Sequence, residues 1–357
     1  MKFSFKIIYV TLIQFFELLF CLSTFTSCEK EPNKSQIILQ NDSTTNGVFI
    51  INEGNFQQAN ASLGFINYTN NIKYDDVFEP SNGRKLGDVL QSMTMYKNKI
   101  YLVVNNSGII EIIHPQTFKS IASISGFRSP RYLLPIDSNK AYVSDLYDNA
   151  ISVLDLNSKQ IVKKIPLIGW SEEMISLNGN TYVTNMRKNF ISVIDNSTDA
   201  IVDTITTPFA PKNILLDSAN RIWILCGDNV SSIDNKYFIV RLDSLNENVE
   251  IKFEIKTTNV SANKLRINKD GNTLFWIDKD VFKMSIYSKV LPTQPIVYSN
   301  GKSFYGLNID LKFKEIWVSD VKDFNSNSDV FQYDFSGNLR GSFTAGKITG
   351  DFYFSYK

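Results

Sequence analysis

One short strand pattern recurs seven times along this chain and limits its fold more than any other feature. Each copy is apolar and carries an aromatic residue at its third position, as in KIYLVV, KAYVSD and EIWVSD. The aromatic residues are Phe49, Tyr101, Tyr142, Tyr182, Trp223, Phe275 and Trp317, which subtraction places 52, 41, 40, 41, 52 and 42 residues apart. A repeat of roughly 40–50 residues built from short strands is typical of a β-propeller.

The third repeat shows how each unit divides into four strands. Apolar runs at 132–136, 141–144, 151–154 and 161–165 are separated by turns rich in Asn, Asp and Ser. Four antiparallel strands in each of seven units predict an all-β, seven-bladed propeller over residues 47–357. Because one blade cannot bury its own faces, we expect the second-strand aromatics to fill the layers between blades.

The first repeat lacks an inner strand, since residues 29–46 are polar. At the other end, the segment DFYFSY at 351–356 follows a complete seventh repeat and has no partner. We expect this segment to supply the inner strand of blade one, which would close the ring and remove an exposed edge. The remaining blades are predicted to begin near Leu86, Arg131, Glu172, Lys212, Asn263 and Tyr305.

Residues 1–27 have the features of a lipoprotein signal peptide. A start with Lys2 and Lys6 precedes a mostly apolar stretch, and Phe25-Thr26-Ser27-Cys28 resembles a bacterial lipobox. Lipidation is therefore predicted at Cys28, and residues 28–46 are predicted to form a flexible tether. The alternative is a membrane-spanning anchor, for which the apolar stretch is short and is interrupted by Glu17.

Acidic residues beside Cys28 suggest where the anchored protein would lie. Glu29 and Glu31 resemble a surface-export signal of Bacteroidetes-type lipoproteins, so the predicted location is the outer membrane, at the cell surface. Without residues 1–27 the chain has 35 basic and 35 acidic residues, because two lysines and one glutamate leave with that segment. This balance argues against a nucleic-acid partner, which would require a basic face.

The sequence offers little for catalysis, and we predict no enzymatic activity, cofactor or metal. His114 is the only histidine and stands at a predicted turn, which disfavours a Ser-His-Asp triad and histidine-based metal sites. There is no phosphate loop and no dinucleotide fingerprint. Cys226, at a strand end, is expected to be a buried and inert thiol.

Several stretches carry a resemblance to a known family. INEGNF at Ile51, LGDVLQSMTMY at Leu86, VVNNSG at Val103, SPRYLLP at Ser129 and AYVSDLYDNAISVLDL at Ala141 resemble the YncE-like propeller lipoproteins of Bacteroidetes. That family includes surface-exposed cobalamin-binding propellers that work beside TonB-dependent transporters. The resemblance therefore implies a corrinoid ligand passed to such a transporter. A protein-interaction scaffold at the cell envelope is the alternative.

One face of the propeller is predicted to carry the binding site. Loops between second and third strands and loops between blades share this face, which we call the loop face. The second strands end there in Asn52, Asp145, Asn185, Asp278 and Asp320, with Asn105 one place further on, and these side chains either cap their own turns or form a polar ring around a pocket mouth.

The loops themselves add aromatic, charged and amide side chains to the predicted site. These are Glu53, Asn55, Phe56, Arg84, Lys85, Phe127, Arg128, Tyr147, Trp170, Arg187, Phe209, Lys212, Phe304 and Tyr305. Such a mixture suits a large, flat, partly polar ligand and a protein partner equally well. Phe127, Arg128, Tyr147, Trp170 and Arg187 are expected to converge near the channel mouth. Longer loops at 52–62, 226–237 and 321–329 are expected to form a raised rim.

Overall fold

The structure is a computed structural model that describes residues 45–227, 236–242, 249–256 and 263–356. Its contacts divide the chain into residues 1–36 and 37–357, and the propeller lies in the second unit. The predicted signal peptide, Cys28 and nearly all of the predicted tether fall outside the described residues. Within the described ranges, no helix is long and apolar enough to cross a membrane.

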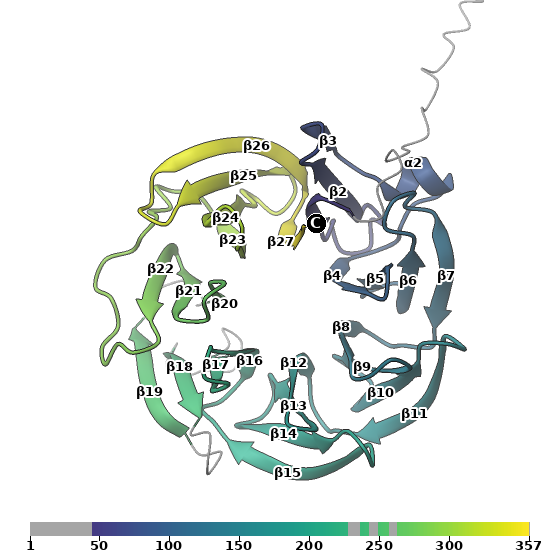
Figure 1. Cartoon of the computed structure of the whole chain (residues 1–357), viewed down its shortest axis with the longest axis horizontal. Coiled ribbons are helices and arrows are strands. Elements are labelled where there is room, and N and C mark those ends of the chain that lie inside the picture. The colour runs from purple at the N-terminus through teal and green to yellow at the C-terminus, as the bar shows by residue number, and fades with distance from the viewer. Residues whose placement is uncertain (1–44, 228–235, 243–248, 257–262, 357) are drawn as a thin grey trace, which may run out of the picture. The chain divides into compact units, whose positions relative to one another are not determined.

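Seven antiparallel sheets surround a central axis, as the repeats predicted (Figure 1). The innermost strand of each sheet lies beside the axis and starts within four residues of its predicted position. These strands are β27 (Thr349–Ser355), β4 (Leu90–Tyr96), β8 (Pro130–Pro135), β12 (Ser171–Leu177), β16 (Pro211–Leu216), β20 (Asn263–Ile267) and β23 (Phe304–Asp310).

The second strands contain the recurring aromatic residues. They are β1 (Gly47–Asn52), β5 (Lys99–Val104), β9 (Lys140–Asp145), β13 (Asn180–Asn185), β17 (Ile222–Cys226), β21 (Thr273–Asp278) and β24 (Glu315–Asp320). None of the seven aromatics is more than 3% exposed, which confirms that they fill the core. Burying a large apolar side chain contributes about 1.5–3 kcal/mol, so these positions hold the blades together.

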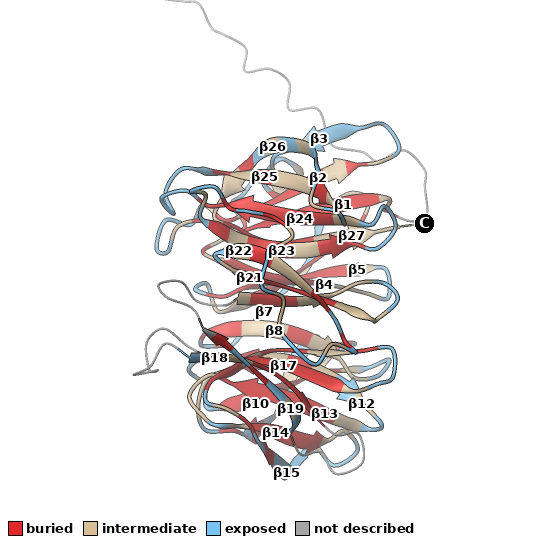
Figure 2. Ribbon diagram, turned by 90° about the vertical axis from the view of Figure 1, so that its left-hand side faces the viewer, coloured by how far each residue is buried: buried red, intermediate tan, exposed pale blue. Residues whose placement is uncertain are grey.

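The third and outer strands complete the blades. The third strands are β2 (Ser62–Asn67), β6 (Ile109–Ile113), β10 (Ala150–Asp155), β14 (Phe190–Asp195), β18 (Lys236–Leu242), β22 (Asp280–Ser285) and β25 (Asn327–Asp334). The outer strands are β3 (Ile72–Tyr74), β7 (Ser120–Ser125), β11 (Gln160–Pro166), β15 (Ala200–Thr206), β19 (Val249–Lys256) and β26 (Leu339–Lys347). Figure 2 shows that second and third strands such as β24 and β10 are mostly buried, whereas β3 and β15 are mostly exposed.

Blade six departs from the predicted four strands. Its described residues form a three-stranded sheet, and only one bridge, between Val281 and Val297, occupies the place of an outer strand. Pro292 and Pro295 stand in the segment that would have formed it. Proline has no N–H to donate to a ladder, which explains why pairing stops at a single bridge.

A short helix that the sequence analysis did not predict joins blades one and two. Helix α2 (Phe78–Asn82) buries Phe78, and the Asp76 carboxylate accepts a hydrogen bond from the Phe78 N–H at 2.9 Å. Gly83 ends the helix with a φ of 67°, a left-handed conformation that glycine adopts without strain. Five residues are too few to give a periodic apolar signal, so the helix was missed.

The C-terminal strand closes the ring. Strand β27 pairs antiparallel with β1, placing Ser355 opposite Gly47 and Tyr353 opposite Phe49. Phe352 of β27 is 1% exposed, and its ring centroid lies 5.6 Å from that of Trp317 in blade seven. The predicted closure is therefore confirmed, with the strand beginning two residues earlier than expected.

His114 and Cys226 have the structural roles that the sequence predicted for them. His114 Nδ1 accepts hydrogen bonds from the N–H groups of Gln116 and Thr117 at 3.2 and 3.4 Å, as expected of a turn residue. Cys226 is completely buried, and burial raises the pKa of its thiol. A buried thiol with a raised pKa is a poor nucleophile, in agreement with the predicted inert role.

Candidate binding site

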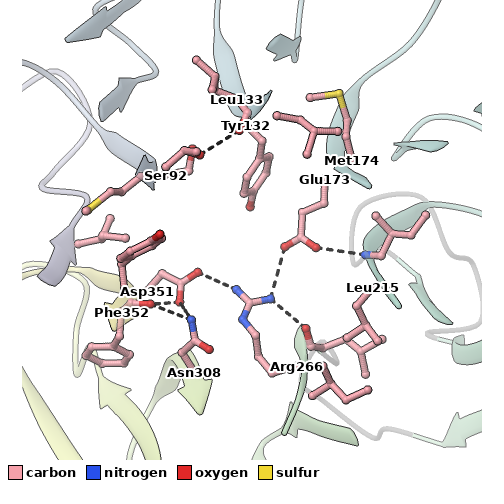
Figure 3. Close-up of a pocket in the computed structure, with 18 residues that line it drawn as sticks. Ser92, Tyr132, Leu133, Glu173, Met174, Leu215, Arg266, Asn308, Asp351 and Phe352 are labelled. Carbon is pink, nitrogen blue, oxygen red and sulfur yellow. Dashed lines mark hydrogen bonds and ion pairs between the residues drawn. The ribbon is translucent and has the colours of Figure 1, made fainter. Parts of the chain in front are cut away.

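The centre of the propeller contains a cavity of about 390 Å³, which we call the axial cavity (Figure 3). The inner strands of all blades contribute to its wall, so its shape depends on the whole ring. Its polar lining comes from Ser92, Thr94, Tyr132, Glu173, Arg266, Asn308 and Asp351. A volume of this size is within the range of small-molecule pockets, which runs from about 300 to 1,000 Å³.

Arg266 is the centre of the polar network in the axial cavity. Its guanidinium lies 2.7 Å from an Asp351 carboxylate oxygen and 3.4 Å from one of Glu173, as Figure 3 shows. Burial alone would lower the pKa of Arg266, but Asp351 and Glu173 outweigh burial and raise it. Arg266 therefore remains a cation held between two carboxylates.

Neighbouring blades fix both carboxylates in place. Glu173 accepts hydrogen bonds from the Asn213 side-chain amide at 2.8 Å and from the Ile214 N–H at 3.1 Å. Asp351 accepts one from the Asn308 side-chain amide at 3.1 Å. The network thus joins blades four, five, six, seven and one, and its geometry is preorganised before any ligand arrives.

Tyr132 stands across the axial cavity from this network, with its hydroxyl directed toward the middle (Figure 3). Within the described part of the chain, that hydroxyl has no hydrogen-bond partner. Burial, and then the charges of Glu173 and Glu172, raise the pKa of Tyr132 well above its usual value. The hydroxyl therefore stays protonated and is available as a hydrogen-bond donor to a ligand.

A separate group of side chains fills the loop-face end of the channel. We call this group, consisting of Glu53, Gln91, Arg131, Glu172, Lys264 and Tyr305, the axial plug. Arg131 Nε donates to both Glu172 carboxylate oxygens at 3.0 Å, and its guanidinium also donates to the Gln91 amide oxygen. Burial raises the pKa of Glu172, while Arg131 acts to lower it.

The other half of the axial plug is built around Glu53. The Tyr305 hydroxyl donates to Glu53 at 3.2 Å, and Lys264 Nζ lies 5.7 Å from the centroid of the Tyr305 ring. A Cβ on Gly350 would lie 2.2 Å from a Glu53 carboxylate oxygen, so a larger residue there would displace this carboxylate from its present position. Burial raises the pKa of Glu53, and Lys264 and Arg131 partly oppose that rise.

The axial plug lies above the axial cavity. Its inner-strand members Gln91, Arg131 and Glu172 each precede by one position a residue that lines the cavity. Plug and cavity are therefore successive layers along the axis, with the plug nearer the loop face. Paired side chains therefore occupy the channel at the end where the sequence predicted a pocket mouth.

The opposite face of the propeller carries the turns between first and second strands, and we call it the turn face. A second cavity of about 640 Å³, the lower cavity, lies there and shares Ile267, Asn308, Phe352 and Tyr353 with the axial cavity. Its remaining lining residues are Lys269, Ile309, Leu311, Lys312, Phe354 and Tyr356. The shared residues place the two cavities next to each other, with the lower cavity nearer the turn face.

The polar strand ends expected around a pocket mouth have structural roles instead. Asn52, Asn105, Asp145 and Asn185 are at most 8% exposed. The Asp145 carboxylate accepts four backbone N–H groups of nearby loops, and Asn185 accepts two. Asn52 accepts from the Thr349 hydroxyl at 2.7 Å, and Asn105 donates to the Pro130 carbonyl at 2.9 Å. Asp145 and Asn185 thus cap local turns, as one of the two alternatives predicted, whereas Asn52 and Asn105 bond to neighbouring segments of the chain.

Three further predicted residues lie elsewhere than expected. Phe127 and Phe304 are core residues, 8% and 9% exposed, because they pack against the apolar layers between blades. Arg84 pairs with Glu111 of β6 at 2.7 Å, and its guanidinium lies 4.9 Å from the Phe78 ring. These contacts place Arg84 on the flank of blade two, away from the channel.

Four predicted residues do converge on the loop face. We call Arg128, Tyr147, Trp170 and Arg187 the loop-face patch. The Arg187 guanidinium lies 3.7 Å from the centroid of the Trp170 ring, and Tyr147 packs edge-on against Trp170 at 5.7 Å. Arg128 donates to the Tyr147 carbonyl at 3.0 Å. Tyr147 remains 49% exposed, so the patch offers aromatic surface to solvent.

The remaining predicted residues lie in separate loops. Phe56 and Phe209 are 63% and 38% exposed. The Asn55 side chain donates to the Phe324 carbonyl at 2.7 Å, which ties the long loop of blade one to that of blade seven. Most of the third long loop, at 226–237, lies outside the described residues.

Residues 46–349 match a family described as a domain of unknown function, DUF5074. This chain belongs to the DUF5074 family. No curated protein matches it.

Solved structures similar to this DUF5074 chain share its fold. A quinonprotein alcohol dehydrogenase-like protein from Bacteroides thetaiotaomicron is 16% identical with a TM-score of 0.70, covering 88% of this chain and 79% of that one. A functionally unknown protein from Desulfotomaculum acetoxidans is 13% identical with a TM-score of 0.62, covering 87% and 98%.

Hydrazine synthase from Kuenenia stuttgartiensis is 16% identical with a TM-score of 0.57, covering 72% of the DUF5074 chain and 87% of its own. At these identities the likenesses show the propeller fold alone.

The residues that line the axial cavity of this DUF5074 protein were missed by the sequence analysis. Glu173, Arg266 and Asp351 each lie within an inner strand that also carries apolar residues, as in SEEMISL, NKLRI and TGDFYFS. Charged residues inside strands predicted to face the axis were the available signal. Aligning the inner strands by position would have shown that several blades place such residues at one level.

Proposed function

We propose that this DUF5074 protein is a non-catalytic binding protein that holds a small molecule in its axial cavity. The observation that carries the proposal is the convergence of Arg266, two carboxylates and the Tyr132 hydroxyl in one channel-lining layer. The hydroxyl has no partner in the described chain, and the charged groups are fixed by neighbouring blades. Fixed polar groups within a cavity are what a specific binding site requires.

A ligand screen tests this proposal. Compounds that raise the melting temperature of the full chain would be titrated by calorimetry into wild type and Tyr132→Phe, which loses only the hydroxyl. One lost hydrogen bond of about 1 kcal/mol should weaken binding roughly fivefold. Tyr287→Phe is the matched control, since that ring is 69% exposed and lines neither cavity. Equal affinities for wild type and Tyr132→Phe would contradict the proposal.

The loop-face patch supports a second candidate function, which is docking of a larger partner. The Trp170–Arg187 stack beside an exposed Tyr147 combines flat aromatic surface with hydrogen-bond donors. A corrinoid, suggested by the resemblance to YncE-like lipoproteins, has a broad apolar ring with amide edges that suits such a platform. An envelope protein such as a TonB-dependent receptor is the alternative occupant, because Trp, Tyr and Arg dominate interaction hot spots.

Trp170→Ala distinguishes these occupants. Loss of a hot-spot side chain should cost at least ~2 kcal/mol, or roughly thirtyfold in affinity. Calorimetric titration with cobalamin measures the first occupant, and no binding at micromolar concentration removes the corrinoid. Capture of a TonB-dependent receptor that is lost with Trp170→Ala would then support the scaffold. The melting temperature should not change, because Trp170 lies in a loop.

We also propose that lipid on Cys28 anchors the protein in the outer membrane at the cell surface. The stretch Phe25-Thr26-Ser27-Cys28 and the acidic residues after it support this. Cys28→Ala should abolish palmitate labelling and release the protein from membranes, as detergent partitioning would show. Protease treatment of intact cells should cleave the wild type if it is surface-exposed. Unchanged membrane association of Cys28→Ala would rule out the lipid anchor.

A further inference from the structure

We infer that the lower cavity binds an amphipathic organic anion, meaning a compound with a flat apolar body and one carboxylate, sulfonate or phosphate group. This rests on the proposed binding role and names the class of ligand that the channel takes. Three features of the cavity carry the inference: an aromatic wall, a pair of lysines at its rim, and carboxylates at its inner end.

The aromatic wall is formed by the closing strand and its neighbours. Phe352, Tyr353 and Phe354 of β27 line the cavity together with Tyr356. The rings of Phe354 and Tyr356 are nearly parallel, 5° apart in plane with centroids 6.4 Å apart. Parallel aromatic rings beside the exposed aliphatic side chain of Leu311 present a surface on which a planar apolar body can pack.

The rim of the lower cavity carries two lysines, Lys269 and Lys312, in the first-to-second-strand turns of blades six and seven. Neither forms an ion pair within the described residues. Lys312 Nζ lies 5.2 Å from the centroid of the Tyr356 ring, so its charge stands directly beside the aromatic wall. Asp270, which follows Lys269, is exposed and lines neither cavity.

The nearest buried carboxylate does not neutralise these lysines. Asp310 is fully buried and accepts hydrogen bonds from the hydroxyl groups of Tyr68 and Tyr356. It also accepts the backbone N–H groups of Lys312 and Phe313, each at 2.9 Å. With its oxygens occupied by these donors, Asp310 acts as a structural group and forms no ion pair with Lys312, so the ammonium group of Lys312 remains available to an anion.

The inner end of the channel fixes the orientation of the ligand. Beyond Asn308, which both cavities share, lie Asp351 and Glu173. Arg266 offsets one of these two negative charges, so the inner end keeps a net negative charge that repels an anionic group. Lys269 and Lys312 at the rim attract an anion and repel a cation. The anion therefore stays at the turn-face rim, and the apolar body extends inward along β27.

Calorimetric titration of the full chain with 2-naphthoate and with 2-naphthamide tests the inference. The two probes share one ring system and differ in charge. At low salt, naphthoate should bind about tenfold more tightly. Changing Lys269 and Lys312 together to Met keeps the apolar stems and should remove the preference. Lys314→Met is the matched control, because Lys314 is exposed in the same turn as Lys312 but does not line the cavity.

Salt gives an independent readout of the same interaction. Raising the ionic strength to 0.15 M shortens the screening length to about 8 Å, so naphthoate binding should weaken while naphthamide binding should not. Equal affinity for both probes, or an equal loss with Lys314→Met, would overturn the inference. If the ligand screen finds binders and none is an anion, only the ligand class fails. If no compound of any charge binds, the proposed function fails too.

Discussion

The two ends of the central channel use charge in opposite ways. At the loop face, Arg131 and Glu172 are paired with each other and fill the space between the blades. At the turn face, Lys269 and Lys312 stand at the rim of an open cavity, without ion pairs in the described part of the chain. The same ring therefore has a filled end and an open one.

This difference separates structural charge from charge that is available to a ligand. Buried ions need partners because desolvation costs several kcal/mol per ion, so the axial plug is mutually satisfied. Exposed lysines on the rim have no such cost and can exchange water for an anion. A search based only on where charged or aromatic loops cluster would choose the loop face, and that was the choice made from the sequence.

The largest expected loss of stability comes from removing residues 351–357, which would alter both the axial cavity and the lower cavity. Strand β27 supplies Asp351 to the axial cavity and the aromatic wall to the lower cavity, and it closes the ring. Loss of buried Phe352 alone should cost about 3–5 kcal/mol, or roughly 10 °C in melting temperature. Calorimetric melting measures this, with removal of residue 357 alone as control. A melting temperature equal to that of the full chain would contradict the closure.

A smaller loss of stability should distinguish the loop-face end of the channel from the turn-face end. Glu172→Ala leaves the Arg131 charge without its carboxylate and should lower the free energy of unfolding by about 3 kcal/mol. Lys312→Met at the open end should change it by less than about 0.5 kcal/mol. Urea unfolding of both variants measures the difference. Comparable losses would show that the lysine rim is structural as well.

The smallest expected effect is a pH dependence of stability that arises from Glu53 in the axial plug. The pKa of Glu53 in the folded protein is raised above its usual 4.5, mainly by burial. Below pH 4.5 both folded and unfolded chains are protonated there. As the pH rises from 4.5 through the folded pKa, the unfolded chain ionises first, and the folded state loses stability.

Glu53→Gln cannot ionise, so this variant should be more stable than wild type at pH 7.5. The two proteins should have equal stability near pH 4, and melting curves across this range are the measurement. Glu254→Gln, at an exposed position on β19, should show no such pH-dependent difference. A gain that persists unchanged at pH 4 would rule out ionisation of Glu53 as its cause.

The sequence predicted most of the fold because the relevant signals are local. Aromatic third positions and apolar alternation lie within single strands, and β1 lacked an inner neighbour that only β27 could supply. The prediction of four strands was wrong for blade six, because Pro292 and Pro295 interrupt the segment expected to form its outer strand. A single proline hardly changes the recurring apolar pattern, but it removes a backbone N–H that pairing with the next strand requires.

The site was less predictable because it depends on side chains that meet across the axis. Glu53 and Tyr305 were identified as loop residues, but the sequence did not show that they bond to each other in the axial plug, where Gly350 leaves space for the Glu53 carboxylate. Whether one end of the channel is open depends on side chains from all blades that lie at the same height along the axis, and on how long those side chains are. No single stretch of sequence contains that information.

The closure of blade one has a consequence for how the chain reaches its native state. Ser355 Oγ donates to the Thr45 carbonyl across 310 positions of sequence, whereas all other blades are built from consecutive segments. Contacts of such long range form late during folding. Joining distant segments lowers the conformational entropy of the chain before the contact contributes any stabilising energy. Until then β1 has an unpaired edge, so an open, six-blade intermediate is the species most exposed to aggregation. Slow refolding should be the kinetic signature of this ring.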